Sequence, residues 1–222
     1  MKLYLSSYRI PDVETFLRFI NKPKDKIKLG LILNAKDDKP DKERLEKSKE
    51  LILYFKDIVS YVEEIDLRNF YKNNNELEST LKRFDVLWFN GGNTFMLRYS
   101  LKESGLDGMI KALLEEGIVV GGDSAGAIVL GPTLKYFDSA DDPSVAPIQI
   151  YEGLNMIDTS IIPHWESEKY QSILTKIEES LSYDGYKTRT ITDEQFLLAE
   201  TKENKDSFLL YTPQHSGKKI NK

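Results

Sequence analysis

The chain has 222 residues, of which 40% are hydrophobic and 30% are charged. This composition supplies enough apolar material for a sizeable core and too much for a disordered chain. The formal net charge of −5 argues against a nucleic-acid partner, because nucleic acid usually selects a basic face. The sequence contains no cysteine, which excludes a disulfide framework, a thiolate zinc site, an iron–sulfur cluster and a cysteine nucleophile.

Residues 1–7 form a short apolar run that meets polar residues at once, without the length or the cleavage pattern of a signal peptide. No stretch approaches the roughly 20 consecutive apolar residues that a membrane-spanning helix needs. We therefore expect a cytoplasmic protein with no membrane partner.

Short apolar runs alternate with helical patterns through the first 130 residues. Strands are predicted at 3–5, 28–34, 61–66, 85–89 and 118–121. Helices are predicted after Pro11, at 42–55, at 76–82, after a cap at Thr94, at 106–116 and from Ser124 onward. Such alternation favours an α/β fold with a mostly parallel sheet and helices on both faces.

After Pro132 the pattern loosens, and residues 136–147 are typical of a loop. Further strands are predicted at 159–162, 189–192, 196–199 and 208–211, with a helix at 166–181. Because no internal repeat, low-complexity tract or linker is visible, we expect one domain over residues 1–222.

The segment 122–126, Gly-Asp-Ser-Ala-Gly, matches the pattern G-x-S-x-G between a predicted strand and a predicted helix. A nucleophile on such a sharp turn needs small neighbours, because the backbone is strained and larger side chains would collide. The turn also brings the next amide, on Ala125, and the helix N-terminus close to an oxyanion on a substrate. Ser124 is therefore the candidate nucleophile, although a tight turn with Ser124 as helix N-cap is the alternative.

A second glycine turn, Asn90-Gly91-Gly92-Asn93, follows another predicted strand. Adjacent glycines let the backbone approach a ligand and turn its N–H groups toward an anion. Sites in open parallel sheets form at the carboxyl ends of strands, so this turn and Ser124 can face one site. We interpret the turn as part of an oxyanion hole.

A serine nucleophile needs a base, and the chain has only two histidines. His164 follows a predicted strand and is the preferred base, whereas His215 lies near the end of the chain. The acid that would orient the imidazole stays open at this point. The candidates are Asp141, Asp142, Asp193 and Glu194.

Four features in this order resemble peptidase family S51, which contains the α-aspartyl dipeptidases (peptidase E) and the cyanophycinases. They are Gly-Gly-Asn-Thr at 91–94, the elbow at 122–127, Pro-Thr at 132–133 and Pro-His at 163–164. The resemblance runs from about residue 85 to residue 165. It implies a three-layer fold like that of the class I glutamine amidotransferases (flavodoxin-like), with serine at the elbow where those enzymes carry cysteine.

The same resemblance implies roles for particular residues. Ser124 would be the nucleophile and His164 the general base, while the amides of Gly92 and Ala125 would form the oxyanion hole and Gly91 would support that turn. The family pattern permits either of two acids, an aspartate before the histidine (Asp141) or a glutamate after it (Glu194), and we lean to Glu194. It implies a small peptide as substrate and no cofactor or metal, and it is compatible with a homodimer.

Two features depart from peptidase E. Asp123 precedes the serine where members of peptidase E carry tryptophan, and residues 165–170 are acidic and lack arginine. A preference for N-terminal aspartate therefore does not follow from the resemblance. Two other functions share the elbow. One is an esterase of the α/β-hydrolase type that uses His215, and the other is a non-catalytic binding protein of the amidotransferase-like class.

Overall fold

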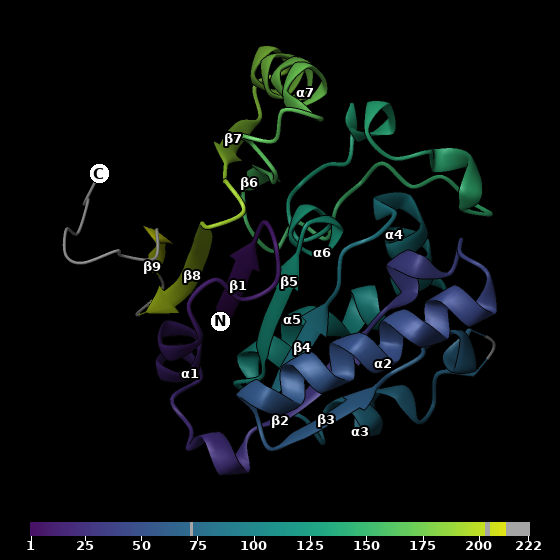
Figure 1. Ribbon diagram of the computed structural model, residues 1–222, viewed down its shortest axis with the longest axis vertical. Coiled ribbons are helices and arrows are strands. Elements are labelled where there is room, and N and C mark those ends of the chain that lie inside the picture. The colour runs from purple at the N-terminus through teal and green to yellow at the C-terminus, as the bar shows by residue number, and fades with distance from the viewer. Residues whose placement is uncertain (72, 203–204, 212–222) are drawn as a thin grey trace.

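The computed structural model describes residues 1–71, 73–202 and 205–211. Within them, a seven-stranded sheet has the order β3-β2-β4-β5-β1-β8-β9 (Figure 1). Neighbouring strands from β3 to β1 run parallel, whereas β8 and β9 add an antiparallel hairpin beside β1. The strands are β1 Lys2–Ser6, β2 Lys28–Ile32, β3 Tyr61–Glu64, β4 Val86–Phe89, β5 Val119–Asp123, β8 Phe196–Lys202 and β9 Lys205–Tyr211. The predicted α/β fold with a mostly parallel sheet is confirmed.

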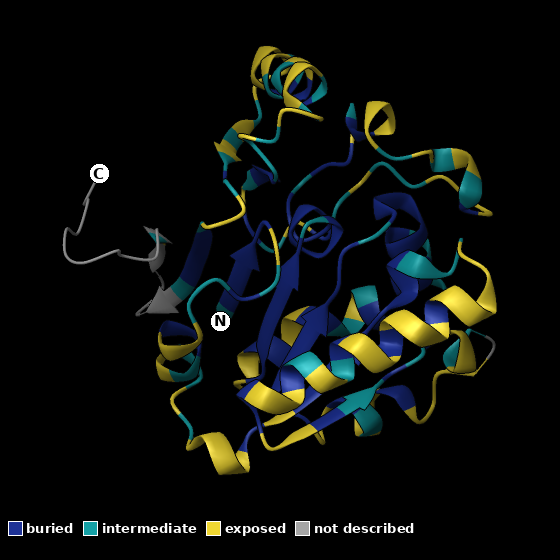
Figure 2. Ribbon diagram, in the orientation of Figure 1, coloured by how far each residue is buried: buried dark blue, intermediate teal, exposed yellow. Residues whose placement is uncertain are grey.

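Helices cover both faces of this sheet. On one face lie α1 (Val13–Ile20) and α2 (Asp41–Ile58), and on the other lie α3 (Leu77–Leu81), α4 (Thr94–Glu103), α5 (Leu106–Glu115) and α6 (Ala125–Ile128). Side chains alternate between two apolar cores, so that Leu3 and Leu5 of β1 enter one core and Tyr4 enters the other. Figure 2 shows the central strands buried and the outer side of α2 exposed.

The register of the parallel strands sets where each strand ends. Ile32 of β2 lies opposite Phe89 of β4, which lies opposite Gly122 of β5, which lies opposite Leu5 of β1. These four residues form one row across the sheet. The loops that follow the four strands therefore leave the sheet at the same edge, where sites in such folds form.

A second, smaller sheet lies within residues 159–190, between the parallel strands and the final hairpin. Its strands β6 (Thr159–Ile162) and β7 (Lys187–Thr190) are parallel, and α7 (Gln171–Tyr183) connects them. In Figure 1 this unit lies at the top, beyond the end of β1. Because β6 and β7 run parallel, the residues that follow them emerge side by side.

Several element boundaries differ from the predictions. Helix α7 begins at Gln171 rather than near 166, and α6 is a single turn. Asn93, not Thr94, is the N-cap of α4, because its side chain accepts a hydrogen bond from the Met96 amide at 2.9 Å. The loop expected at 136–147 contains two short 3-10 turns, η4 (Phe137–Ser139) and η5 (Pro143–Val145). The remaining 3-10 turns are η1 (Lys24–Lys26), η2 (Asn34–Lys36) and η3 (Leu67–Phe70).

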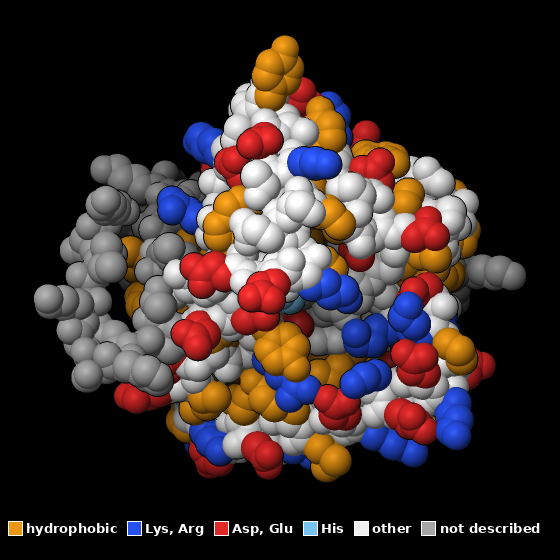
Figure 3. Space-filling model, turned by 45° about the horizontal axis from the view of Figure 1, so that its top comes forward, with side chains coloured by type: hydrophobic (Ala, Val, Ile, Leu, Met, Phe, Trp, Pro, Cys, Tyr) orange, Lys and Arg blue, Asp and Glu red, His pale blue; other side chains and the backbone are white. Residues whose placement is uncertain are grey.

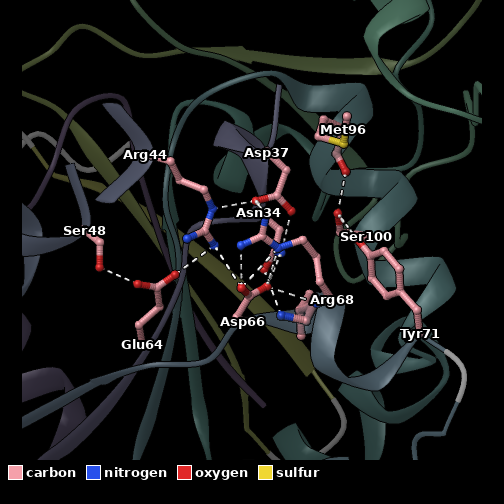
Figure 4. A network of polar contacts seen from close by, with 11 residues as sticks. Asn34, Asp37, Arg44, Ser48, Glu64, Asp66, Arg68, Tyr71, Met96 and Ser100 are labelled. Carbon is pink, nitrogen blue, oxygen red and sulfur yellow. Dashed lines mark hydrogen bonds and ion pairs between the residues drawn. The ribbon is translucent and has the colours of Figure 1, made fainter. Parts of the chain in front are cut away.

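A network of charged side chains fixes η2, the turn that follows β2 (Figure 4). Arg44 of α2 is buried and lies 2.6 Å from Asp37 and 2.8 Å from Glu64. Asn34 donates to Asp37 at 2.7 Å and to Asp66 at 3.2 Å. The turn is thereby held from both sides, by α2 and by the segment after β3.

No helix among the described residues is both long enough and apolar enough to cross a membrane.

We predict that Arg44→Ala destabilises the protein by about 1–3 kcal/mol, because the partly buried carboxylates of Asp37 and Glu64 each lose their contact with the guanidinium. Arg83→Ala is the matched control, since Arg83 forms an exposed ion pair with Glu63 and its loss should cost less than about 1 kcal/mol. Urea unfolding of both variants measures the difference. Equal losses would contradict the structural importance of the network.

Candidate active site

Ser124 lies at the end of β5, where the chain turns directly into α6. Its backbone angles, φ 52° and ψ −115°, are strained for a residue with a side chain, at a cost of about 1–3 kcal/mol. The turn closes only because its neighbours are small, since a Cβ on Gly126 would lie 1.9 Å from the Phe89 carbonyl oxygen. This is the geometry that the G-x-S-x-G pattern predicts for a nucleophile.

His164 lies directly against Ser124. Its Nε2 is 3.0 Å from the Ser124 Oγ, within hydrogen-bonding distance. His164 follows β6 after Pro163 and has a positive φ of 59°, so the backbone turns sharply and aims the ring at the main sheet. The geometry brings the predicted nucleophile and the predicted base together. His215 lies outside the described residues.

The carboxylate that contacts His164 belongs to Asp193. Its Oδ1 lies 2.6 Å from the His164 Nδ1, on the side of the ring opposite Ser124. Asp193 follows β7, and β7 pairs in parallel with β6, the strand that precedes His164, so both residues lie beyond the same end of the small sheet. Asp193 is one of the four candidate acids in the sequence, where its neighbour Glu194 is preferred.

The acids favoured from the sequence lie elsewhere. Glu194 is exposed, and no hydrogen bond or ion pair among the described residues joins it to His164. Asp141 accepts hydrogen bonds from the Thr94 amide at 2.9 Å and from its hydroxyl at 2.6 Å, at the start of α4. Burial raises the pKa of Asp141 while these hydrogen bonds lower it. The Asp142 carboxylate accepts from the Ser144 amide and caps η5.

Ser7 also belongs to this group, and sequence reasoning did not single it out. It follows β1 directly and its side chain is fully buried. The hydroxyl donates to Asp193 at 2.6 Å and accepts from the backbone N–H of His164 at 2.7 Å. The sequence signal that could have indicated it is its position shortly after the first predicted strand, at 3–5.

The glycine turn after β4 packs closely against η2. A Cβ on Gly92 would lie 2.4 Å from the Ala35 carbonyl oxygen, which also accepts the Asn93 amide at 2.7 Å. The Asn93 side chain caps α4 and donates to the Asp142 carbonyl, so it serves the structure of the turn. Among the described residues, the N–H groups of Gly92 and Ala125 have no protein acceptor.

A buried carboxylate holds this glycine turn beside the elbow. Asp123 accepts hydrogen bonds from Trp88 Nε1 at 2.8 Å and from the Asn90 side chain at 3.0 Å. Burial raises the pKa of Asp123, and the hydrogen bonds of Trp88 and Asn90 oppose that rise. In the sequence, Asp123 occupies the variable position of the G-x-S-x-G pattern. That pattern does not indicate that its carboxylate binds Trp88 and Asn90.

A cleft of about 240 Å³ opens beside Ser124 and His164. Three basic side chains line it, namely Arg9, Lys36 and Lys47. In Figure 3, which turns the top of Figure 1 toward the viewer, Lys and Arg side chains gather near the middle of this face with acidic side chains among them. Glu166 and Glu168, the acidic residues after the histidine, are exposed and do not line the cleft.

The cations of the cleft differ in their partners. Glu50 lies 2.6 Å from Arg9 and 2.7 Å from Lys47, so it neutralises part of their charge. Lys36 is half-buried and forms no ion pair with any described residue. Burial lowers the pKa of Lys36, and the negative charge of Asp123 partly opposes this. Lys36 is therefore a cation at the site whose charge the protein balances only weakly.

Comparison with known proteins supports a family assignment. The model of peptidase family S51 matches residues 44–205. An uncharacterized peptidase of Listeria innocua is 29% identical over 144 residues, which cover 64% of this chain and 68% of that protein. An uncharacterized peptidase of Listeria monocytogenes is 32% identical over 117 residues, covering 52% of this chain and 56% of that protein. Peptidase E of Nostoc sp. is 34% identical over 102 residues, covering 46% of this chain and 40% of that protein.

Solved structures share the fold. A peptidase E-type protein from Listeria monocytogenes EGD-e aligns with a TM-score of 0.77 and 24% identity, covering 96% of this chain and 98% of that chain. A peptidase from an acI-B1 Actinobacterium aligns with a TM-score of 0.61 and 18% identity, covering 95% and 87%. At these identities the likeness concerns the fold alone.

Proposed function

Because the chain belongs to peptidase family S51, we propose that it hydrolyses short peptides through an acyl-enzyme on Ser124. The observation that carries the proposal is the continuous line of contacts from the Ser124 Oγ through the His164 ring to the Asp193 carboxylate, at 3.0 and 2.6 Å. This arrangement has the three roles of a serine-hydrolase triad, namely nucleophile, base and orienting acid.

The reaction would proceed in two halves. His164 Nε2 takes the proton of the Ser124 hydroxyl as the oxygen attacks the scissile carbonyl carbon. The resulting oxyanion lies near the backbone N–H groups of Gly92 and Ala125, and His164 then gives the proton to the leaving amine as the C–N bond breaks. A water molecule, deprotonated by the same imidazole, hydrolyses the ester and restores Ser124.

Asp193 would fix the His164 ring so that Nδ1 carries a proton and Nε2 is free to act as a base. The short contact at Nδ1 supports this role, and Glu194 and Asp141 lack such a contact. Asp193 therefore replaces both of them as the proposed acid.

We predict that Asp193→Asn lowers kcat by about 10³–10⁴-fold, because the amide favours the wrong tautomer of the ring. Glu194→Gln is the matched control on the neighbouring residue and should keep kcat close to that of the native protein. A dipeptide-hydrolysis assay of both variants, beside Ser124→Ala as the inactive reference, provides the measurement. A large loss with Glu194→Gln and none with Asp193→Asn would reverse the assignment.

We also propose that the preferred peptides carry a carboxylate near the scissile bond. The support is Lys36, a half-buried cation that lines the cleft and has no ion-pair partner among the described residues. A substrate carboxylate would restore the stabilisation that burial removes from its charged form. The charges of Arg9 and Lys47 contribute less, because Glu50 already pairs with both.

We predict that Lys36→Met lowers kcat/KM for acidic dipeptides by about 10–100-fold, the value of a hydrogen bond to a charged group. Its effect on neutral dipeptides should be much smaller. Lys82→Met, which removes an exposed cation paired with Glu78 and Glu116, is the control. A panel of Asp-X, Glu-X, Asn-X and Ala-X dipeptides measures the preference, and equal losses on acidic and neutral dipeptides would contradict the proposal.

A further inference from the structure

Ser7 connects the two sheets at the place where the site forms. It follows β1 of the main sheet, while both of its hydrogen-bond partners, Asp193 and His164, follow strands of the small sheet. We propose that Ser7 is a positioning residue of the reaction, which holds the Asp193 carboxylate and the His164 backbone where the triad needs them. This inference rests on the proposed function of Ser124, His164 and Asp193.

The hydrogen-bonding capacity of the hydroxyl defines what it does. A serine hydroxyl has one proton to donate and two lone pairs that accept. The proton goes to the Asp193 Oδ1 at 2.6 Å, and a lone pair accepts the His164 N–H at 2.7 Å. The His164 Nδ1 lies further away, at 3.3 Å, and has the closer Asp193 Oδ1 as partner at 2.6 Å. Ser7 therefore acts on the imidazole indirectly, through the Asp193 carboxylate and the His164 backbone.

Asp193 needs such an anchor because it is poorly enclosed. Its side chain is 54% exposed, whereas Ser7 is fully buried and cannot itself reorient easily. An exposed carboxylate on a turn can rotate into water, where it no longer orients the ring. The same oxygen that contacts His164 accepts the Ser7 proton, so the bond holds the one rotamer in which Asp193 touches the histidine.

The bond to the His164 backbone has a second consequence. His164 has φ 59°, in the left-handed region that residues with a side chain rarely adopt. The hydrogen bond from its N–H to Ser7 helps to stabilise this conformation, and the conformation points the ring toward Ser124. A displacement of about 1 Å in such a group costs on the order of 100-fold in rate.

The test is a double-mutant cycle. Ser7→Ala should lower kcat by about 10–100-fold while KM changes little, because the hydroxyl acts on the catalytic groups and not on the bound peptide. In an Asp193→Ala background, the part of that factor that acts through the carboxylate should disappear, so the loss should be clearly smaller and come only from the bond to the His164 N–H. Ser104→Ala is the matched control, because it removes another fully buried hydroxyl, at the end of α4, and should leave kcat unchanged.

Two results would overturn the inference: native kcat in Ser7→Ala, or the same loss in both backgrounds, which is what a general packing defect produces. Thermal unfolding of each variant checks folding. If Ser7→Ala does not fold, Ser7→Cys, which keeps the size and a weak donor, replaces it in the same cycle with the same expectation. Failure of the proposed function has a different signature, since Ser124→Ala would then hydrolyse dipeptides as well as the native protein.

Discussion

The site depends on the register of four parallel strands. Because Ile32, Phe89, Gly122 and Leu5 lie in one row, the chain leaves β2, β4, β5 and β1 at the same level. Each exit supplies one part of the site, namely the η2 turn with Lys36, the glycine turn, the elbow and Ser7. A slip of one residue in any pair would turn the side chains of that strand to the opposite face. The apolar cores on both faces of the sheet hold the register against such a slip.

At two places in the site, backbone segments approach so closely that only glycine fits. The elbow touches β4 through Gly126, and the glycine turn touches η2 through Gly92, at distances that leave no room for a Cβ. The space that remains is filled by polar groups with defined partners, above all the buried Asp123 with Trp88 and Asn90. The charged network around Arg44 of α2 then holds η2 in place. Ser124 and the glycine turn are thus held by the main sheet, whereas His164 and Asp193 follow strands of the small sheet.

Those segments of the candidate site that have a recognisable local sequence pattern could be predicted from the sequence. The elbow, the glycine turn and His164 each follow a recognisable strand, and the structure brings the three together. Which carboxylate contacts His164 could not be predicted, because the choice between Asp193 and Glu194 depends on how a single turn rotates two neighbouring side chains. In that turn, the Gln195 amide bonds to the Thr192 carbonyl, and Asp193 faces the histidine. The division into two sheets, the contacts of Ser7 and the position of Lys36 in the cleft depend on tertiary packing, which no local pattern encodes.

The central claim is that Ser124 is an activated nucleophile. Intact-mass spectrometry of the folded protein after treatment with a fluorophosphonate, followed by peptide mapping, tests it most directly. We expect one covalent adduct on Ser124 that is absent in Ser124→Ala and forms far more slowly in His164→Ala. No adduct on Ser124, at a reagent level that fully labels a control serine hydrolase, would contradict the claim, as would labelling that persists at the same rate without His164.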